Sequence, residues 1–120
     1  MTKTLPPERT YKDGQAVIEQ GEPAMEAFLI TAGAARVSTK GVVLATLREG
    51  EIFGEAALFK GSDYGADVHA EGELQVQPIT PAILDEKIAG CDPLIRALMR
   101  MMMVRLRRAN ENLSKQDKAV

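Results

Sequence analysis

A glycine–glutamate pair followed by small apolar residues is the part of this sequence best suited to hold a ligand. Residues 53–58 read Phe-Gly-Glu-Ala-Ala-Leu and follow a turn at 49–51. The pattern predicts a short apolar turn of helix with one carboxylate, Glu55, at its start. The first N–H groups of a helix have no internal partner, and the helix dipole is positive there. We therefore expect a site for a small polar ligand, especially an anion, at this turn.

The residues after a short polar loop alternate in polarity. One face carries Tyr64, Ala66, Val68 and Ala70, and the other carries Asp67 and His69. A period of two residues is typical of a strand, because successive side chains point to opposite faces. This stretch is therefore predicted to be a strand with one buried side.

Together these two stretches resemble the phosphate-binding cassette of cyclic nucleotide-binding domains. The shared pattern is Phe-Gly-Glu-x-Ala-Leu, a short loop, and then Ala-x-Val-x-Ala. Matches at 17–24, 28–33 and 47–53 extend the resemblance over about residues 11–110, nearly the whole chain. The resemblance implies a mainly β fold, a jelly-roll β-barrel followed by a short helix and a long C-terminal helix.

The resemblance also implies roles for the cassette residues. In the family, the glutamate binds the ribose 2′-hydroxyl, the glycine and the following amides surround the cyclic phosphate, and an arginine clamps its charge. Carried over by position, the ligand-binding residues are Phe53, Gly54, Glu55, Ala56, Ala57, Tyr64, Gly65 and Ala66. Here Tyr64 stands at the arginine position and Gly65 at a serine or threonine position. Both departures affect the groups that hold the phosphate.

Loss of the arginine predicts weak or absent binding of cAMP and cGMP, because a cyclic phosphate without a cation is costly in a partly buried site. Lys60 could replace the charge, or Arg36 or Arg48 could reach across from neighbouring strands. Alternatively, Tyr64 lies across the site with its hydroxyl on Glu55 and plugs it. We favour the plug, because Tyr64 shares the inward face of the strand that follows. A different ligand, uncharged or carrying its own cation, is a further alternative.

The elements that must position this cassette are short strands separated by turns. Turns at 11–14 and 20–23 bracket a strand at 16–18, and an apolar run at 28–30 is closed by Gly33. Strands at 34–38 and 42–47 are predicted to pair through a hairpin at 39–41, with a further strand at 74–77. This order favours a β-barrel or sandwich rather than alternating βαβ units. With the family resemblance, we expect a β-barrel over 11–79, preceded by an arm at 1–10.

Two helices are predicted after the barrel, over 80–113. Thr80-Pro81 is a helix start, and Gly90 can end the helix at 82–89. Asp92-Pro93 repeats the start signal for a helix from Pro93 to about Leu113, with a tail at 114–120.

The long helix carries more apolar surface than one packing face requires. Two seven-residue series form a seam: Ile95, Met102 and Ala109, and Met99, Leu106 and Leu113. The family frequently places this helix at a dimer interface, so we expect a homodimer through Pro93 to Leu113. The alternative is that the helix folds over its own domain.

Composition limits the remaining function classes. With 120 residues, 45% apolar and 27% charged, the chain is expected to be one domain over 1–120. Residues 1–95 hold 8 basic and 15 acidic side chains, whereas 96–120 hold 7 basic and 2 acidic ones. A solvated helix face explains this basic end better than a nucleic-acid site. No run of residues fits a signal peptide or a membrane span, so a cytoplasmic protein is expected.

Catalysis is not expected. His69 is the single histidine and is predicted to point outward, so no metal site of histidines and a carboxylate is apparent. Cys91 is the single cysteine and has no catalytic base at motif spacing. A DNA-binding helix-turn-helix would need more chain than 112–120. Two classes remain: a regulatory domain that senses a small ligand, or a degenerate member that serves as a dimerisation and protein-interaction module.

Overall fold

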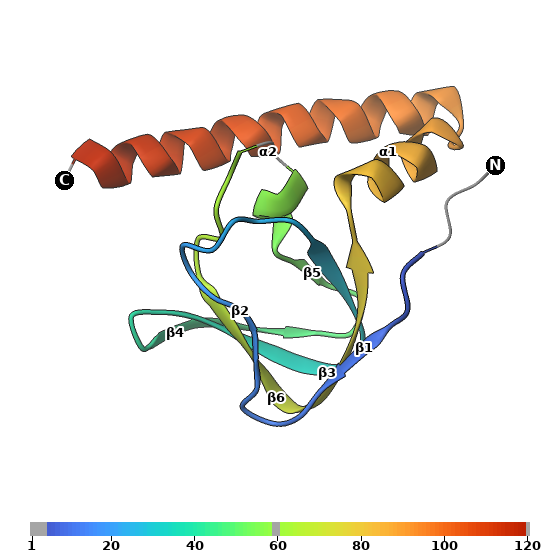
Figure 1. Ribbon diagram of the computed structural model, residues 1–120. Helices are drawn as coiled ribbons and strands as arrows, with labels where there is room; N and C mark the ends of the chain where they lie inside the picture. The colour runs from blue at the N-terminus through green and yellow to red at the C-terminus, as the bar shows by residue number, and fades with distance from the viewer. Residues whose placement is uncertain (1–4, 59–60, 120) are drawn as a thin grey trace. The chain divides into compact units, whose positions relative to one another are not determined.

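The computed structural model describes residues 5–58 and 61–119, with side chains up to residue 109 (Figure 1). The chain divides within helix α1 (Pro81–Ala89), between Ile83 and Leu84, into two compact units. The first unit contains the strands, and the second contains most of α1 and helix α2 (Pro93–Ala119). The predicted class, mainly β followed by a short and a long helix, is confirmed.

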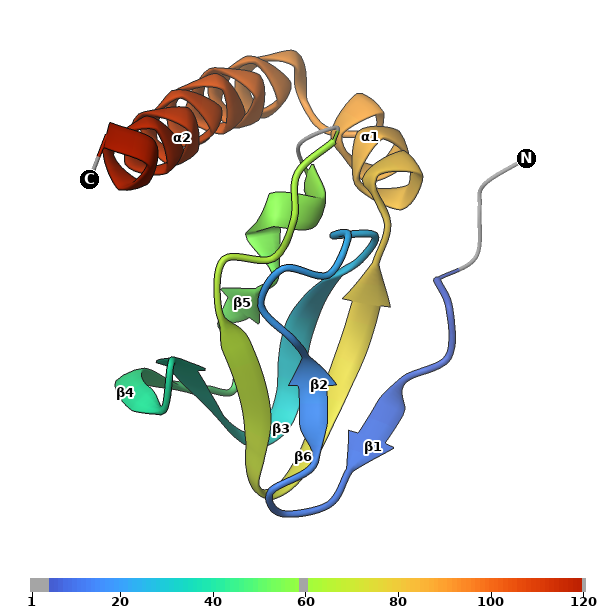
Figure 2. The ribbon, with the colours of Figure 1, turned by 60° about the vertical axis from the view of Figure 1, so that its left-hand side comes forward.

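The strands form one antiparallel sheet of six members with the order β1-β6-β3-β4, in which β2 also pairs with β6 and β5 with β3 (Figures 1 and 2). Their bounds are β1 Arg9–Tyr11, β2 Ala16–Ile18, β3 Ala27–Thr39, β4 Val42–Arg48, β5 Ile52–Phe53 and β6 Asp67–Ile79. The long strands β3 and β6 pair with each other from Ala27↔Ile79 to Ser38↔Asp67. Their inward side chains, among them Ile30, Val68, Leu74 and Val76, are almost fully buried and form the core.

Gly33 lies inside β3 rather than at its end, which corrects the prediction that it closes a strand. Its φ is +87°, and the β3–β6 register shifts around it, between Ile30 and Ala34. A Cβ atom at this position would lie 2.2 Å from the carbonyl oxygen of Glu73 on β6. Glycine is therefore required here, both for the left-handed backbone and for the close approach of the two strands.

The hairpin between β3 and β4 follows the prediction. Lys40 and Gly41 have φ values of +51° and +80°, which is the conformation that a two-residue hairpin turn requires. Val37 pairs with Ala45 and Ser38 with Val43, so that Leu44 is an extra residue in β4. This bulge makes the pairing of the hairpin irregular near its turn.

Three further boundaries differ from the prediction. The arm is shorter than 1–10, because Arg9–Tyr11 pairs with β6 as β1. The strands expected at 64–70 and 74–77 belong to one strand, β6, which begins only at Asp67. The helical turn after Gly54 is a four-residue 3₁₀-helix, η1 (Glu55–Leu58).

The helices begin where their capping residues predict. The Thr80 hydroxyl oxygen accepts a hydrogen bond from the Ile83 amide at 3.3 Å, and the Asp92 carboxylate accepts one from the Leu94 amide at 2.9 Å. Helix α1 ends at Ala89, just before Gly90, as expected. Helix α2 continues to Ala119, beyond the predicted end near Leu113. No helix in the described part of the chain is both long enough and apolar enough to cross a membrane.

The Gly33 contact gives a test of the sheet. We expect Gly33→Ala to lower the free energy of unfolding by about 3 kcal/mol or more, because the new methyl group overlaps the Glu73 carbonyl in addition to straining the backbone. Gly41→Ala is the matched control, since Gly41 also has a positive φ but has nothing within 4 Å of its Cβ position. Its expected loss is about 1 kcal/mol.

Urea unfolding followed by tyrosine fluorescence measures both variants, because both tyrosines, Tyr11 and Tyr64, lie in the first unit and the chain has no tryptophan. Equal losses for the two variants would mean that the close approach of β3 to β6 does not constrain the sheet.

Candidate functional site

The cassette is attached to the barrel through β5. Phe53 pairs with Phe28 of β3, and their rings stack with centroids 5.2 Å apart. Both phenylalanines are buried, so this stacked pair fixes where the chain leaves β5. Gly54 and η1 follow directly and are held against β3.

Gly54 is buried and has a positive φ of +75°. A Cβ at Gly54 would lie 3.2 Å from the Glu26 carbonyl oxygen and 3.4 Å from Cε1 of Tyr64. The glycine therefore lets the backbone of the cassette approach both the entry to β3 and the Tyr64 ring.

The 3₁₀-helix η1 has a polar start and a buried body. The Glu55 side chain is exposed, while Ala56 and Ala57 are buried. Within the described residues Glu55 forms no ion pair or side-chain hydrogen bond. The Ala57 amide donates to the Gly54 carbonyl at 3.1 Å, so this amide is already engaged within the turn. The free polar groups of the cassette are thus concentrated at its first residues.

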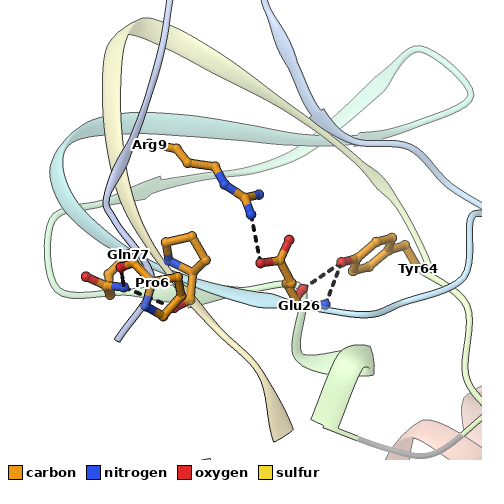
Figure 3. Close-up of polar contacts among 6 residues, drawn as sticks. Pro6, Arg9, Glu26, Tyr64 and Gln77 are labelled. Atoms are coloured by element: carbon orange, nitrogen blue, oxygen red, sulfur yellow. Dashed lines mark hydrogen bonds and ion pairs between the residues drawn. The ribbon is translucent and has the colours of Figure 1, made fainter. Parts of the chain in front are cut away.

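Tyr64 is buried, with 8% of its surface exposed. The predicted contact of its hydroxyl with Glu55 is wrong. The hydroxyl donates to the Glu26 carbonyl at 2.6 Å and accepts from the Glu26 amide at 3.2 Å (Figure 3). A hydroxyl has one proton to donate, and here that proton is used by Glu26. The hydroxyl binds Glu26 rather than Glu55 because the backbone of Glu26 lies beside Gly54, whereas the Glu55 carboxylate faces solvent.

The main chain also holds Tyr64 in place. Its amide donates to the Glu22 carbonyl and its carbonyl accepts from the Gly21 amide, each at 2.9 Å. Next to it, Pro23 and Asp63 form an antiparallel bridge. The loop before β6 is therefore paired with the loop before β3, and the Tyr64 ring has little freedom to leave its position.

The Glu26 side chain connects this network to the N-terminal strand. The Arg9 guanidinium donates to the Glu26 carboxylate at 2.9 Å and lies over the Phe28 ring, 5.9 Å from its centroid (Figure 3). The hydrogen bond to Glu26 raises the pKa of Arg9 further, and a guanidinium is in any case charged at neutral pH. The cation nearest to Tyr64 in this network is thus paired with a carboxylate already.

The cations expected to replace the family's arginine do not lie toward the cassette. Ala35 is fully buried, so its neighbour Arg36 lies on the opposite, outer face of β3. Arg48 pairs with Ala34 and shares that outer face. Two of the three expected replacements are therefore wrong, and Lys60 lies outside the described residues.

The last two predicted cassette residues carry no side-chain polar group. Gly65 is exposed, its φ lies outside the left-handed region, and a Cβ there would meet nothing within 4 Å. A serine would therefore fit at this position without strain. Ala66 is half-buried and leads into β6.

The structure brings together Phe53, Gly54 and Tyr64, as the sequence predicts, but it adds partners that the sequence does not indicate. Glu26 contributes backbone atoms to the Tyr64 contact, and Arg9 is paired to it from the predicted arm. Phe28 was predicted only as part of an apolar run. In the described residues, no group of three or more histidine, cysteine, aspartate or glutamate side chains is placed to bind a metal.

Comparison with known proteins places this chain in a family. Residues 8–89 match the cyclic nucleotide-binding domain family. Among solved structures, the chain is similar to the half-site-occupied form of the EAL enzyme Bd1971, with 30% identity, a TM-score of 0.79, and coverage of 87% of this chain and 97% of the other. The cGMP-bound form of Bd1971 has 28% identity and a TM-score of 0.66, over 93% of this chain and 31% of the other.

A curated relative is the cAMP-dependent protein kinase regulatory subunit of Yarrowia lipolytica, which is 42% identical over 70 residues. The match covers 57% of this chain and 19% of the subunit. The chain thus spans about a fifth of the length of this relative. Domains of this family occur within regulatory proteins and also within larger enzymes.

The Tyr64 hydroxyl gives a test of the site geometry. We expect Tyr64→Phe to lower the free energy of unfolding by about 2 kcal/mol, because the variant leaves the amide and carbonyl of Glu26 without this partner. Tyr11→Phe is the matched control, since the Tyr11 hydroxyl interacts with the partly exposed Arg9. Its expected loss is about 0.5 kcal/mol or less.

Chemical denaturation at neutral pH measures the free energy of unfolding of both variants and of the unsubstituted protein. A Tyr64→Phe variant as stable as the unsubstituted protein would show that the hydroxyl does not hold the entry to β3.

Proposed function

Because the chain belongs to the cyclic nucleotide-binding domain family, we propose that it is a non-catalytic regulatory domain that senses a small ligand at residues 53–66, with weak or altered affinity for cyclic nucleotides. The observation that carries this proposal is the Tyr64 hydroxyl, which is committed to the backbone of Glu26 and supplies no charge to a ligand. Tyr64 is the residue that the sequence resemblance aligns with the phosphate-clamping arginine.

The energetics support a reduced affinity for a cyclic phosphate. An arginine supplies a positive charge and a fork of donors, whereas a tyrosine supplies one hydroxyl. Burying an anion without a paired cation costs several kcal/mol, and hydrogen bonds from amides recover part of this cost. The outer position of Arg36 and Arg48 and the pairing of Arg9 with Glu26 leave the described part of the site without a replacement cation.

The properties of the cassette indicate which ligand would suit it. Glu55 is exposed and unpaired in the described residues, so it can accept hydrogen bonds from hydroxyl groups or pair with a cation. A ligand that is uncharged, or that carries its own cation, therefore fits the site better than a cyclic phosphate. The cytoplasmic location expected from the sequence stays a prediction.

A second candidate function is a dimerisation or protein-interaction module that binds no ligand. It is favoured by the apolar surface of α2, where Leu94 is 68% and Met102 61% exposed and most other large apolar residues of the helix are also exposed. Ile95, Met99 and Leu106 of the predicted seam belong to this surface. Apolar surface of this extent on a helix favours a protein partner. We infer a homodimer through Pro93 to Leu113; the side chain of Leu113 lies outside the described residues.

Titration calorimetry tests the ligand proposal. We expect the unsubstituted protein to bind cAMP and cGMP at least about 100-fold more weakly than a Tyr64→Arg/Gly65→Ser variant, which regains the charged clamp and the hydroxyl. Tyr64→Gln/Gly65→Ser is the matched control, because it is polar but uncharged and should gain little.

Circular dichroism first verifies that these variants are folded. If the folded arginine variant gains no affinity, the missing clamp is not what weakens binding. Micromolar binding by the unsubstituted protein would mean that another cation, such as Lys60, replaces the arginine.

Light scattering tests the dimer. We expect a mass near twice the 13.0 kDa of one chain, and we expect Met99→Glu/Leu106→Glu to reduce it to that of a monomer, because two charges would be buried at the interface. Arg108→Glu is the control, since it adds a carboxylate to α2 away from the seam. A monomeric mass for the unsubstituted protein would favour a helix that covers its own domain.

A further inference from the structure

The free edge of β4 carries a run of exposed apolar residues in the first unit. Val42, Val43 and Leu44 are 60%, 54% and 60% exposed, although they are consecutive residues of a strand. Among the described strands, β4 pairs with β3 alone, and Figures 1 and 2 show it at the rim of the sheet with no strand on its other side. The strand therefore presents both apolar side chains and a row of backbone groups that pair with no other described strand.

Natural edge strands are usually protected against pairing with another chain. Short length, proline and inward-pointing charges are common devices. β4 is seven residues long and reads Val-Val-Leu-Ala-Thr-Leu-Arg, with no proline and no acidic residue. Its bulge at Leu44 lies near the hairpin turn, so the stretch 45–48 remains regular. An edge of this kind is suited to the addition of an extended peptide as a further strand.

Charge indicates which peptide would fit. The two strands and their turn, residues 27–48, contain Arg36, Lys40 and Arg48 but no aspartate or glutamate, in a unit that is otherwise acidic. None of these three side chains forms an ion pair or a side-chain hydrogen bond with a described residue. Arg36 and Arg48 share the outer face. The β6 carboxylates on that face, Asp67 and Glu71, pair in register with Ser38 and Ala34 rather than with either cation, and the Glu51 carboxylate accepts from the Arg48 amide rather than from its guanidinium. The unmatched positive charge favours an acidic partner.

A second copy of the chain supplies no charge complement at this edge. β4 itself carries one cation, Arg48, and no carboxylate, so pairing with a second β4 would bring together two strands of the same charge. The cations therefore favour a different, acidic chain.

We propose that β4 is a docking edge for an extended, acidic segment of another protein, in which acidic and apolar side chains alternate. The segment adds as a strand beside β4. Because successive side chains alternate between faces, its acidic residues lie next to Arg48 on the outer side, with Arg36 one strand further on, and its apolar residues lie beside Ala45 and Leu47 on the other side. This surface is separate from residues 53–66 and does not depend on a ligand there.

The probe is a labelled peptide of seven residues, the length of β4, that alternates glutamate with valine and is capped at both ends. Fluorescence anisotropy with the full chain measures its affinity, and hydrogen exchange followed by NMR maps the amides that it protects. We expect saturable binding that weakens with added salt, and protection of amides in 42–48. A peptide that alternates lysine with valine should bind at least about tenfold more weakly.

Substitutions locate the contact. Arg48→Glu should weaken binding of the glutamate peptide by about fivefold or more, because it replaces an attraction by a repulsion at an exposed site. Lys12→Glu makes the same charge change at an exposed position away from β4 and should leave the affinity unchanged. A glutamate peptide with N-methyl groups on alternate residues should not bind, because it cannot form the ladder.

Several results would overturn the proposal. In the peptide experiments, these are equal binding of the glutamate and lysine peptides, binding by the N-methylated peptide, or protection only of amides outside β4. In the substitution experiment, it is an equal effect of Arg48→Glu and Lys12→Glu on the affinity. Pairing of β4 with β4 of a second copy, seen as concentration-dependent protection of 42–48 without peptide, would also overturn it.

Discussion

The antiparallel ladder between β3 and β6 is the constraint on which the rest of the first unit depends. Every other described strand is hydrogen-bonded to one of these two: β1 and β2 to β6, and β4 and β5 to β3. Their shared register therefore sets the position of every turn and of the cassette. Gly33 allows this register, because it brings the β3 backbone against the Glu73 carbonyl where no side chain fits. The core residues Ile30 and Val76 pair directly beside this point.

The same ladder also determines the position of the cassette. β5 places Gly54 beside the entry to β3, and the Tyr64 hydroxyl binds Glu26, the residue before β3 begins. The register puts the starts of β3 and β6 at opposite ends of the ladder, so the Tyr64–Glu26 contact joins segments that the strands alone keep apart. Tyr64 thus serves the closure of the fold through its bond to Glu26.

Charge and apolar surface are distributed unevenly along the chain. The acidic side chains of the first unit lie outside the β3–β4 hairpin, which carries cations alone. The second unit exposes apolar side chains along α2, together with arginines such as Arg105 and Arg108. Two separate surfaces, one on each unit, therefore combine exposed apolar groups with positive charge. This combination suits a domain that acts by binding other protein chains.

Much of the fold was predictable because its signals are local. Alternating polarity identified the buried face of β6, glycine identified the hairpin turn at Gly41, and Thr80 and Asp92 identified both helix starts. Two strand boundaries failed for the same reason. Glycine is usually a turn signal, but Gly33 and Gly72 each lie within a long strand, because pairing with the partner strand continues on both sides. β1 is three residues long and has no pattern of its own.

The sequence by itself determined the family and the class of fold, since these depend on residue types and short spacings. Only the tertiary structure decided what Tyr64 does. Its partner lies 38 residues away and offers backbone atoms, which every residue type possesses, so no pattern of side chains could indicate it. The same reason explains why Arg36 and Arg48, plausible as replacements by proximity in the chain, proved to lie on the outer face. Which face a strand residue occupies depends on the register of its partner strands, and that register is a property of the whole sheet.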